Sequence, residues 1–244
     1  MGTWISHFRV AELLLERWPG LDARQFVIGN VAPDSGRPNH DWTSFDPPKS
    51  VTHFLQPGED EGRIRDLTFY REFVQPLRSG DPAHFSFMLG YFAHLVTDNL
   101  WMHLIGQSTQ QAFAAEFDAD KAATWERVKD DWYGLDHKYL RDFPDNAFVQ
   151  WVVDAPNPPS PFSFLPSDAL AYRLDDLRGF YSRPEEFVLD REYPYLSEAS
   201  MNRAVQDCAR EIALLLEQLE GGQIPGDARI SMHVLELPQP YALP

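Results

Sequence analysis

The sequence predicts an all-α fold, a single domain of about seven to nine helices with long Pro-rich loops around a central buried helix. Apolar residues recur at helical spacing along most of the chain, which favours amphipathic helices. Residues 82–105 are apolar almost all round, which is typical of a helix surrounded by others. A hydrophobic content of 43% supports one sizeable core. We expect residues 1–222 to form the domain and residues 223–244 an extended tail packed on it.

The first half of the chain contains the clearest helix boundaries. Helices are predicted over residues 3–18, 22–30, 61–78 and 82–105. Pro19-Gly20 ends the first, and Asp22 is placed to cap the second. Residues 35–60 are rich in Pro, Asp and Gly and are expected to form a long loop, which is commonly functional or disordered. Within it, the His40-Asp41 pair is expected in solvent, whereas apolar neighbours indicate that His53 returns to the core.

The second half carries fewer recognisable signals. Helices are predicted over residues 108–117, 120–142, 167–180 and 197–220. In the helix predicted over residues 120–142, Asp131, Asp136 and His137 are expected on a solvated face. Residues 143–166 combine prolines with aromatic residues and form either a packed connector or the wall of a substrate site. Residues 230–237 are expected as a short strand or an extended arm.

The charge of the chain limits the classes of partner. With 21 Lys and Arg against 37 Asp and Glu, the formal net charge is -16, which disfavours nucleic acid or anionic lipid as a stable partner. An anionic substrate remains compatible, because bound metal ions invert the local field. The single cysteine, Cys208, excludes a disulfide framework and a Cys-rich zinc site. Any metal ion must therefore be held by His, Asp and Glu.

The N-terminal residues lack the basic region and apolar run of a secretory signal. Uninterrupted apolar runs stay shorter than the ~18 residues that a transmembrane helix needs. We therefore expect a soluble, cytoplasmic protein with no transmembrane segment.

Two polar residues interrupt the central apolar segment. His94 and Asp98 are four residues apart, so a helix places them on one face. A buried imidazole and a buried carboxylate are costly unless they are paired or bound to metal. Together they could hold one divalent ion. The alternative is a His–Asp hydrogen bond that satisfies two polar groups of the core.

Further residues follow the order of a known family. His7 lies in the first helix, Asp34 in an Ala-Pro-Asp turn, His53 in Val-Thr-His-Phe, and His94-x-x-x-Asp98 follows Leu-Gly-Tyr-Phe-Ala. In this order the motifs resemble the zinc-dependent phospholipase C family, whose superfamily also contains single-strand-specific zinc nucleases. The resemblance covers roughly residues 1–105 and is strongest around the last motif.

The resemblance implies an all-α protein with one or two divalent metal ions, expected to be zinc. His53, His94 and Asp98 would be direct ligands. Asp98 would bridge to a second ion that His7 also holds. Asp34 would bind metal or act as the general base on the attacking water.

Two departures from the family pattern argue against a third ion. Extracellular members ligate a metal through an N-terminal Trp, whereas Trp4 is preceded by three residues here. His103 lies five residues after Asp98, about 140° away around an ideal helix, so a continuous helix would direct it away from Asp98. His137 is followed four residues later by Arg141, so the family's second His-x-x-x-carboxylate pair is missing. Whether Trp4, His84, His103 or His137 joins the site stays open.

The predicted function is a metal-dependent phosphoester hydrolase in which a metal-activated water attacks phosphorus of a lipid or small-molecule substrate. One alternative is a metallohydrolase acting on a nucleotide or small metabolite. Another is a non-catalytic protein with a structural metal or a satisfied His–Asp core pair. The sequence leaves the substrate, the metal and the oligomeric state open.

Overall fold

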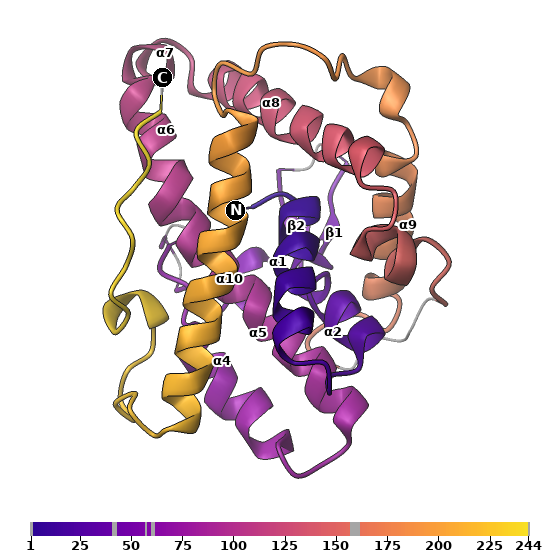
Figure 1. The fold of residues 1–244 in the computed structure, drawn as a ribbon, viewed down its shortest axis with the longest axis vertical. Coiled ribbons are helices and arrows are strands. Elements are labelled where there is room, and N and C mark those ends of the chain that lie inside the picture. The colour runs from indigo at the N-terminus through magenta and orange to yellow at the C-terminus, as the bar shows by residue number, and fades with distance from the viewer. Residues whose placement is uncertain (1, 41–42, 57, 60–61, 157–161, 244) are drawn as a thin grey trace.

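The computed structural model describes residues 2–40, 43–56, 58–59, 62–156 and 162–243. The prediction of an all-α fold is confirmed, since the described residues contain ten α-helices and one two-stranded sheet (Figure 1). The α-helices are α1 (Trp4–Arg17), α2 (Ala23–Gly29), α3 (Lys49–Thr52), α4 (Asp66–Phe69), α5 (Pro82–Trp101), α6 (Gln107–Ala112), α7 (Ala114–Ala119), α8 (Lys121–Asp142), α9 (Ala169–Tyr181) and α10 (Glu198–Glu220). Strands β1 (Arg37–Pro38) and β2 (Phe45–Asp46) pair antiparallel.

Helix α5 lies at the centre of the molecule, as the sequence predicts. Every residue from Ser86 to Trp101 is buried. Helices α1 and α10 run side by side across it (Figure 1), and α2 packs directly against it. Two glycines permit that close approach: a Cβ at Gly29 would lie 2.1 Å from the Phe87 carbonyl oxygen, and one at Gly90 2.0 Å from that of Phe26.

Several element boundaries differ from the predicted ones. The helix expected over residues 61–78 begins only at Asp66 and continues as a π-helical turn (Tyr70–Val74) and a 3-10 turn (Gln75–Leu77). Pro76 cannot donate a backbone hydrogen bond, which explains the change of helix type there. Helix α5 gives way to a π-helical turn, Met102–Gly106, four residues before its predicted end.

The C-terminal tail lies along the helical body, where Figure 1 shows it beside α10. The Tyr241 backbone N–H donates to the Leu104 carbonyl at 3.0 Å, and the Tyr241 hydroxyl donates to Asp207 Oδ2 at 2.6 Å. Ser231 donates to Asp66 through its backbone N–H at 2.8 Å and also through its hydroxyl. Instead of the strand considered for residues 230–237, a 3-10 turn (Ser231–His233) stands there.

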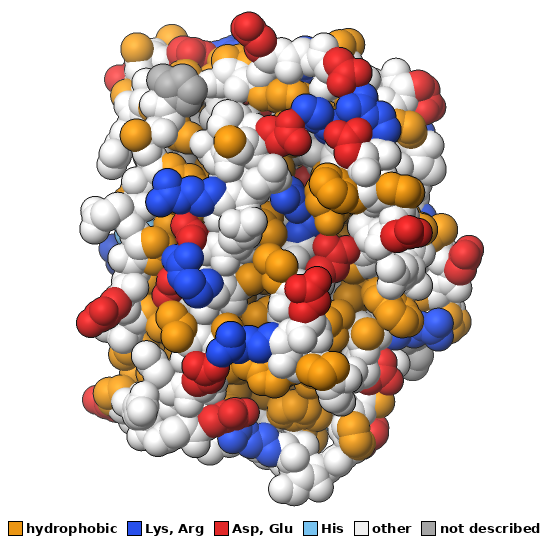
Figure 2. Space-filling model, viewed as in Figure 1, with side chains coloured by type: hydrophobic (Ala, Val, Ile, Leu, Met, Phe, Trp, Pro, Cys, Tyr) orange, Lys and Arg blue, Asp and Glu red, His pale blue; other side chains and the backbone are white. Residues whose placement is uncertain are grey.

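The surface mixes charged and apolar side chains, and Figure 2 shows acidic, basic and hydrophobic groups interspersed on one face. None of the helices among the described residues combines the length and apolar character that a membrane crossing requires. The compartment of the protein stays a prediction from the sequence.

Candidate metal centre

The five residues predicted as metal ligands come together at one place. His7 comes from α1, Asp34 from the 3-10 turn Ala32–Asp34, His53 from the end of α3, and His94 and Asp98 from α5. They form two groups whose ligand atoms lie within 4.8 Å of one another, one of His7, His94 and Asp98 and one of Asp34, His53 and His94. All are buried except Asp34, whose side chain is 9% exposed.

Asp98 lies in the middle of the centre and faces three imidazoles. Its Oδ1 is 3.2 Å from His7 Nε2. Its Oδ2 is 3.4 Å from His94 Nε2 and 3.5 Å from His53 Nε2. The Nε2 atom of His53 is also 3.5 Å from Asp34 Oδ1, so His53 lies between the two carboxylates. The two oxygens of Asp98 therefore face different histidines.

Local structure places these side chains. The i, i+4 spacing on α5 brings His94 and Asp98 to one face of the helix. Thr3 caps α1 by accepting from the Ser6 N–H, which sets His7 on the first turn of that helix. The backbone N–H of Gly2 donates to Asp98 Oδ1 at 3.1 Å, and a Cβ at Gly2 would lie 3.3 Å from His7 Nε2. The chain before α1 thus lies against the centre.

Hydrogen bonds on the outer side of two imidazoles orient the inner nitrogens. His94 Nδ1 lies 2.7 Å from the Asn30 carbonyl oxygen, which can only accept, so Nδ1 carries a proton. In the neutral imidazole, Nε2 then has a free lone pair that points into the centre. His53 Nδ1 is 2.9 Å from Thr52 Oγ1, a hydrogen bond in which either atom can donate and which holds the orientation of that ring.

The inner atoms are buried without hydrogen-bond partners among the described residues. They are Nε2 of His7, His53 and His94 and Oδ2 of Asp98. A buried polar atom without a partner costs free energy, and four of them at one point fit a metal ion that would accept their lone pairs. The His94–Asp98 contact satisfies neither group, so a satisfied core pair does not describe this site.

The charges of the site suit metal binding. Burial, reinforced by the neighbouring charge of His94, lowers the pKa of His7 to about 4, so this imidazole is neutral at pH 7. Burial alone would raise the pKa of Asp34, but the charges of Lys49, His94 and His53 outweigh it and hold that pKa well below its usual range. Burial opposes ionisation of Asp98 too, yet His94 and the other imidazoles keep its pKa well below the usual value. Neutral imidazoles and ionised carboxylates are the forms that bind zinc.

His94 differs from His7. Burial alone would lower the pKa of His94, but the carboxylates of Asp98 and Asp34 and the bond to Asn30 outweigh burial and raise it. Metal binding requires the neutral form of His94, so a metal ion would compete with a proton for this nitrogen.

Three further residues contact the segment that carries Asp34. The sequence motifs leave the role of Trp4 open and do not indicate Lys49 or Arg173. The Trp4 indole N–H donates to Asp34 Oδ2 at 3.0 Å, and Lys49 Nζ is 3.8 Å from Asp34 Oδ1. The buried guanidinium of Arg173, on α9, donates to the Asp34 carbonyl at 2.7 Å and lies 5.4 Å from the Trp4 ring centroid. Trp4 therefore joins the centre as a partner of Asp34, and Arg173 holds the turn that carries Asp34.

The other histidines considered from the sequence lie elsewhere. His84 is exposed in the first turn of α5, and His103 Nε2 is 2.9 Å from the Pro238 carbonyl of the tail. His137 packs against aromatic rings, including Phe187 at a centroid distance of 4.3 Å. His40 is exposed, and its neighbour Asp41 lies outside the described residues.

The prediction of a solvated acidic face on α8 is wrong. Asp131, Asp136 and His137 are all buried, because α9 and the segment after it cover this face. Arg191 donates to Asp131 Oδ1 at 2.5 Å, and the Tyr181 hydroxyl donates to Asp136 Oδ2 at 2.6 Å. Charged residues at helical spacing do not reveal which later segment will cover them.

A cleft of about 890 Å³ lies beside the centre, although none of the five residues is in its lining. The lining includes Gly2, which bonds Asp98, and Lys49, which lies beside Asp34. Its aromatic lining comes from α8, as Trp125, Trp132 and Tyr133. These residues, rather than residues 143–166, form the aromatic wall.

Residues 143–166 behave as a packed connector where they are described. Phe162 is buried and packs on Tyr91 at a centroid distance of 5.0 Å and on Phe164 at 4.7 Å. The described residues that line the cleft lie between positions 2 and 133, so this connector contributes none of them.

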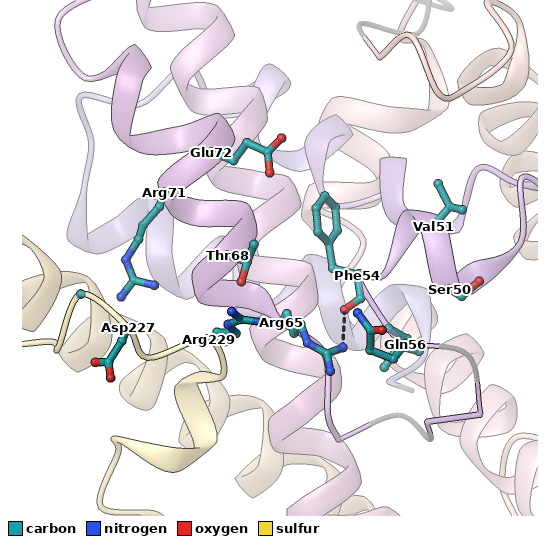
Figure 3. Close-up of a pocket in the computed structure, with 12 residues that line it drawn as sticks. Ser50, Val51, Phe54, Gln56, Arg65, Thr68, Arg71, Glu72, Asp227 and Arg229 are labelled. Atoms are coloured by element: carbon teal, nitrogen blue, oxygen red, sulfur yellow. Dashed lines mark hydrogen bonds between the residues drawn. The ribbon is translucent and has the colours of Figure 1, made fainter.

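A second hollow of about 780 Å³, drawn in Figure 3, also lacks the five residues and, unlike the cleft, lacks Gly2 and Lys49, which contact the centre. Two of its three arginines are engaged. Arg65 forms two hydrogen bonds with Glu59, at 2.7 and 2.9 Å, and also donates to the Phe54 carbonyl (Figure 3). Arg71 donates to the Pro225 carbonyl of the tail at 2.7 Å. Both hollows share Ser50, Leu55 and Gln56 in their walls, so the segment that carries His53 separates them.

Comparisons with known proteins support the resemblance. Comparison with curated proteins and with solved structures gave no match. The family model described as zinc dependent phospholipase C matches residues 6–149, more than half of the chain. The matched range contains all five residues of the centre and ends before Arg173. The chain therefore belongs to the zinc-dependent phospholipase C family, a family of metal-dependent phospholipase-type hydrolases.

Proposed function

We propose that the protein is a metal-dependent phosphoester hydrolase that holds one or two divalent ions, zinc by expectation. The proposed ligands are His7, Asp34, His53, His94 and Asp98. The observation that carries the proposal is the convergence of four buried ligand atoms without hydrogen-bond partners among the described residues, next to an open cleft whose lining residues Gly2 and Lys49 contact Asp98 and Asp34. An open cleft is required for hydrolysis and is unnecessary for a static metal.

The arrangement divides into two sides that share Asp98. His7 faces Asp98 Oδ1, whereas His53 and His94 face Oδ2. Asp34 extends the second side through its contact with His53. A carboxylate whose two oxygens serve different ligand groups is suited to bridge two ions, which supports a count of two over one.

The chemistry would combine bound metal with groups of the chain. Zinc bound by such ligands lowers the pKa of a water molecule toward about 7 and stabilises charge on phosphoryl oxygens. Asp34, ionised and fixed by the Trp4 indole, would orient the attacking water and accept its proton as the new phosphorus–oxygen bond forms. Lys49, near Asp34 Oδ1, would offset negative charge as the leaving oxygen departs.

The first test is elemental analysis of the purified protein after dialysis without chelator. The wild type should hold one or two equivalents of transition metal, and His94→Ala and Asp98→Ala should each lose at least one. His84→Ala is the matched control, because His84 is an exposed histidine on the same helix. A metal-free wild type whose melting temperature does not rise with added zinc would remove the basis of the proposal.

Substrate assays then separate the hydrolase alternatives. Zinc-loaded enzyme is offered bis(p-nitrophenyl) phosphate, phosphatidylcholine vesicles and nucleotides. Hydrolysis of vesicles supports a phospholipase, and hydrolysis of nucleotides alone supports the metabolite alternative. Bound zinc without turnover of any of them would support a non-catalytic role.

A further inference from the structure

The distribution of lysine is uneven in this acidic chain. The whole sequence contains four lysines, and three of them, Lys49, Lys121 and Lys129, line the cleft over the metal centre. Arg63 lines it as well. The formal net charge of the chain is -16, so this group of cations runs against its overall composition. The described lining therefore has more cationic than acidic side chains, on a chain whose overall charge is negative.

The acidic lining of the cleft does not cancel these cations. Among the described lining residues the one carboxylate is Glu59, and it is engaged by Arg65 in a bidentate pair. Lys121 and Lys129 are exposed and form no ion pair with another described residue. The fourth lysine, Lys138, instead pairs with Glu198 at 2.5 Å outside the cleft.

The cations are spread along the cleft. Lys49 lies next to the metal centre, with its Nζ atom 3.8 Å from Asp34 Oδ1. Lys121 and Lys129 both lie on α8, and eight residues of α-helix correspond to about 12 Å along its axis. One phosphate group at the centre could not reach all of them. The spacing fits a ligand with one anionic group at the centre and another further out.

Neutral groups of the cleft can also bind an anion. The amides of Gln107 and Gln110 lie in its lining. These donors would complete the coordination of phosphate or carboxylate oxygens.

We propose that the cleft binds phosphoester substrates that carry a second anionic group beyond the scissile phosphoester, and that Lys121 and Lys129 bind this second group. As a statement about substrates, this inference rests on the proposed hydrolase function. The second group can belong to a phosphorylated lipid headgroup or to a small water-soluble phosphoester. A substrate that ends in a cationic choline group would be disfavoured.

Binding is tested first on metal-free protein, so that no ion contributes. Inorganic pyrophosphate is titrated calorimetrically into the wild type, Lys121→Gln, Lys129→Gln and the double variant. Each single variant should weaken binding by about five- to tenfold, as expected for loss of one charge-assisted contact, and the double variant by more. Lys138→Gln is the matched control, with the same change on the same helix outside the cleft, and should bind as the wild type does. Equal affinity in all five proteins would overturn the inference.

Selectivity is tested on zinc-loaded enzyme with two nitrophenyl phosphodiesters of equal length. One ends in a phosphate group and the other in a trimethylammonium group. The ratio of their kcat/KM values should favour the phosphate ester and fall by about fivefold or more in each cleft variant. Vesicles of a phosphorylated inositol lipid and of phosphatidylcholine extend the comparison, and turnover of the vesicles assigns the second group to a lipid headgroup.

The binding and selectivity experiments distinguish this inference from the proposed hydrolase function on which it rests. Lysine-dependent pyrophosphate binding without any hydrolysis would support the anion site and count against the hydrolase. Hydrolysis whose substrate ratio is the same in the wild type and the cleft variants would support the hydrolase and overturn the anion site.

Discussion

Asp98 and Asn99 are neighbours on α5 and are both fully buried, yet they belong to different polar clusters. Asn99 accepts from the Ile64 N–H at 3.0 Å and donates to the Ile64 carbonyl at 3.0 Å and to Asp66 at 2.9 Å. Asp66 in turn accepts from Ser231 of the tail. Asp98 belongs to the metal centre, where its Oδ2 atom has no hydrogen-bond partner among the described residues. We call Asp66, Asn99 and Ser231 the structural cluster.

The two clusters differ in whether their buried polar atoms have hydrogen-bond partners, and not in how deeply these atoms are buried. A satisfied buried network stabilises the fold by itself, because every donor has an acceptor. A group of inward-pointing imidazoles and carboxylates costs stability until a cation binds. The structural cluster should therefore respond to mutation through stability, and the metal centre through metal content and activity.

The largest expected effect is at Asp98. Asp98→Asn should remove at least one equivalent of zinc and lower kcat/KM by about 1000-fold or more, because a shared ligand of both sides is lost. In the metal-free protein, the variant also loses the stabilisation at neutral pH that the lowered pKa of Asp98 indicates, so zinc content and activity are the quantities that separate Asp98 from Asn99. Retained zinc in Asp98→Asn would place Asp98 in the same class as Asn99.

The neighbouring position should behave in the opposite way. Asn99→Ala leaves the Ile64 backbone groups without their side-chain partner and should lower the unfolding free energy by about 3 kcal/mol. Its zinc content per folded molecule should match that of the wild type. Urea unfolding and elemental analysis measure the two quantities, with the exposed Gln111→Ala on α6 as the control. Zinc loss in Asn99→Ala would contradict the separation of Asn99 from the metal centre.

The pH dependence of stability should also differ between the clusters. Burial raises the pKa of Asp66 to about 6, against the opposing effect of its hydrogen bonds. The folded protein thus holds this proton more tightly than the unfolded chain, so the contribution is complete below about pH 4 and is lost as pH rises through 6. Asp66→Asn lacks this dependence, so its destabilisation relative to the wild type should shrink on the order of 3 kcal/mol from pH 4 to above pH 7.

Asp34 has the opposite sign in the metal-free protein. Its lowered pKa gives a contribution that is present at neutral pH and is lost as pH falls below about 4. Urea unfolding of the metal-free proteins across this range measures both trends, with the same substitution at the exposed Asp118 on α7 as a control. A destabilisation by Asp66→Asn that grows as pH rises would contradict the assignment.

The sequence was sufficient to predict the helical fold and the five residues that meet at the candidate metal centre, because both depend on short-range patterns. His94 and Asp98 share a helix face, and the turn around Asp34 carries its own motif. The supporting residues depend on contacts between distant segments instead. Arg173 meets the Asp34 turn across 139 positions of sequence, and Ser231 meets Asp66 across 165. No local pattern marks either contact, which is also why the covered face of α8 was predicted as solvated.

The smallest effect should sharpen the boundary of the metal centre. Thr52 holds the outer nitrogen of His53, so Thr52→Val, which keeps the shape of the side chain, should weaken zinc binding by about tenfold, or ~1.4 kcal/mol. Chelator competition measures this affinity. Thr109→Val is the matched control, because Thr109 is buried as well and its hydroxyl donates to the Ile105 carbonyl, away from the ligands. If both variants lost zinc affinity equally, the hydroxyl of Thr52 would have a structural role like that of Asn99, and no specific role at the metal centre. A loss confined to Thr52→Val would extend the centre by one residue beyond its ligands.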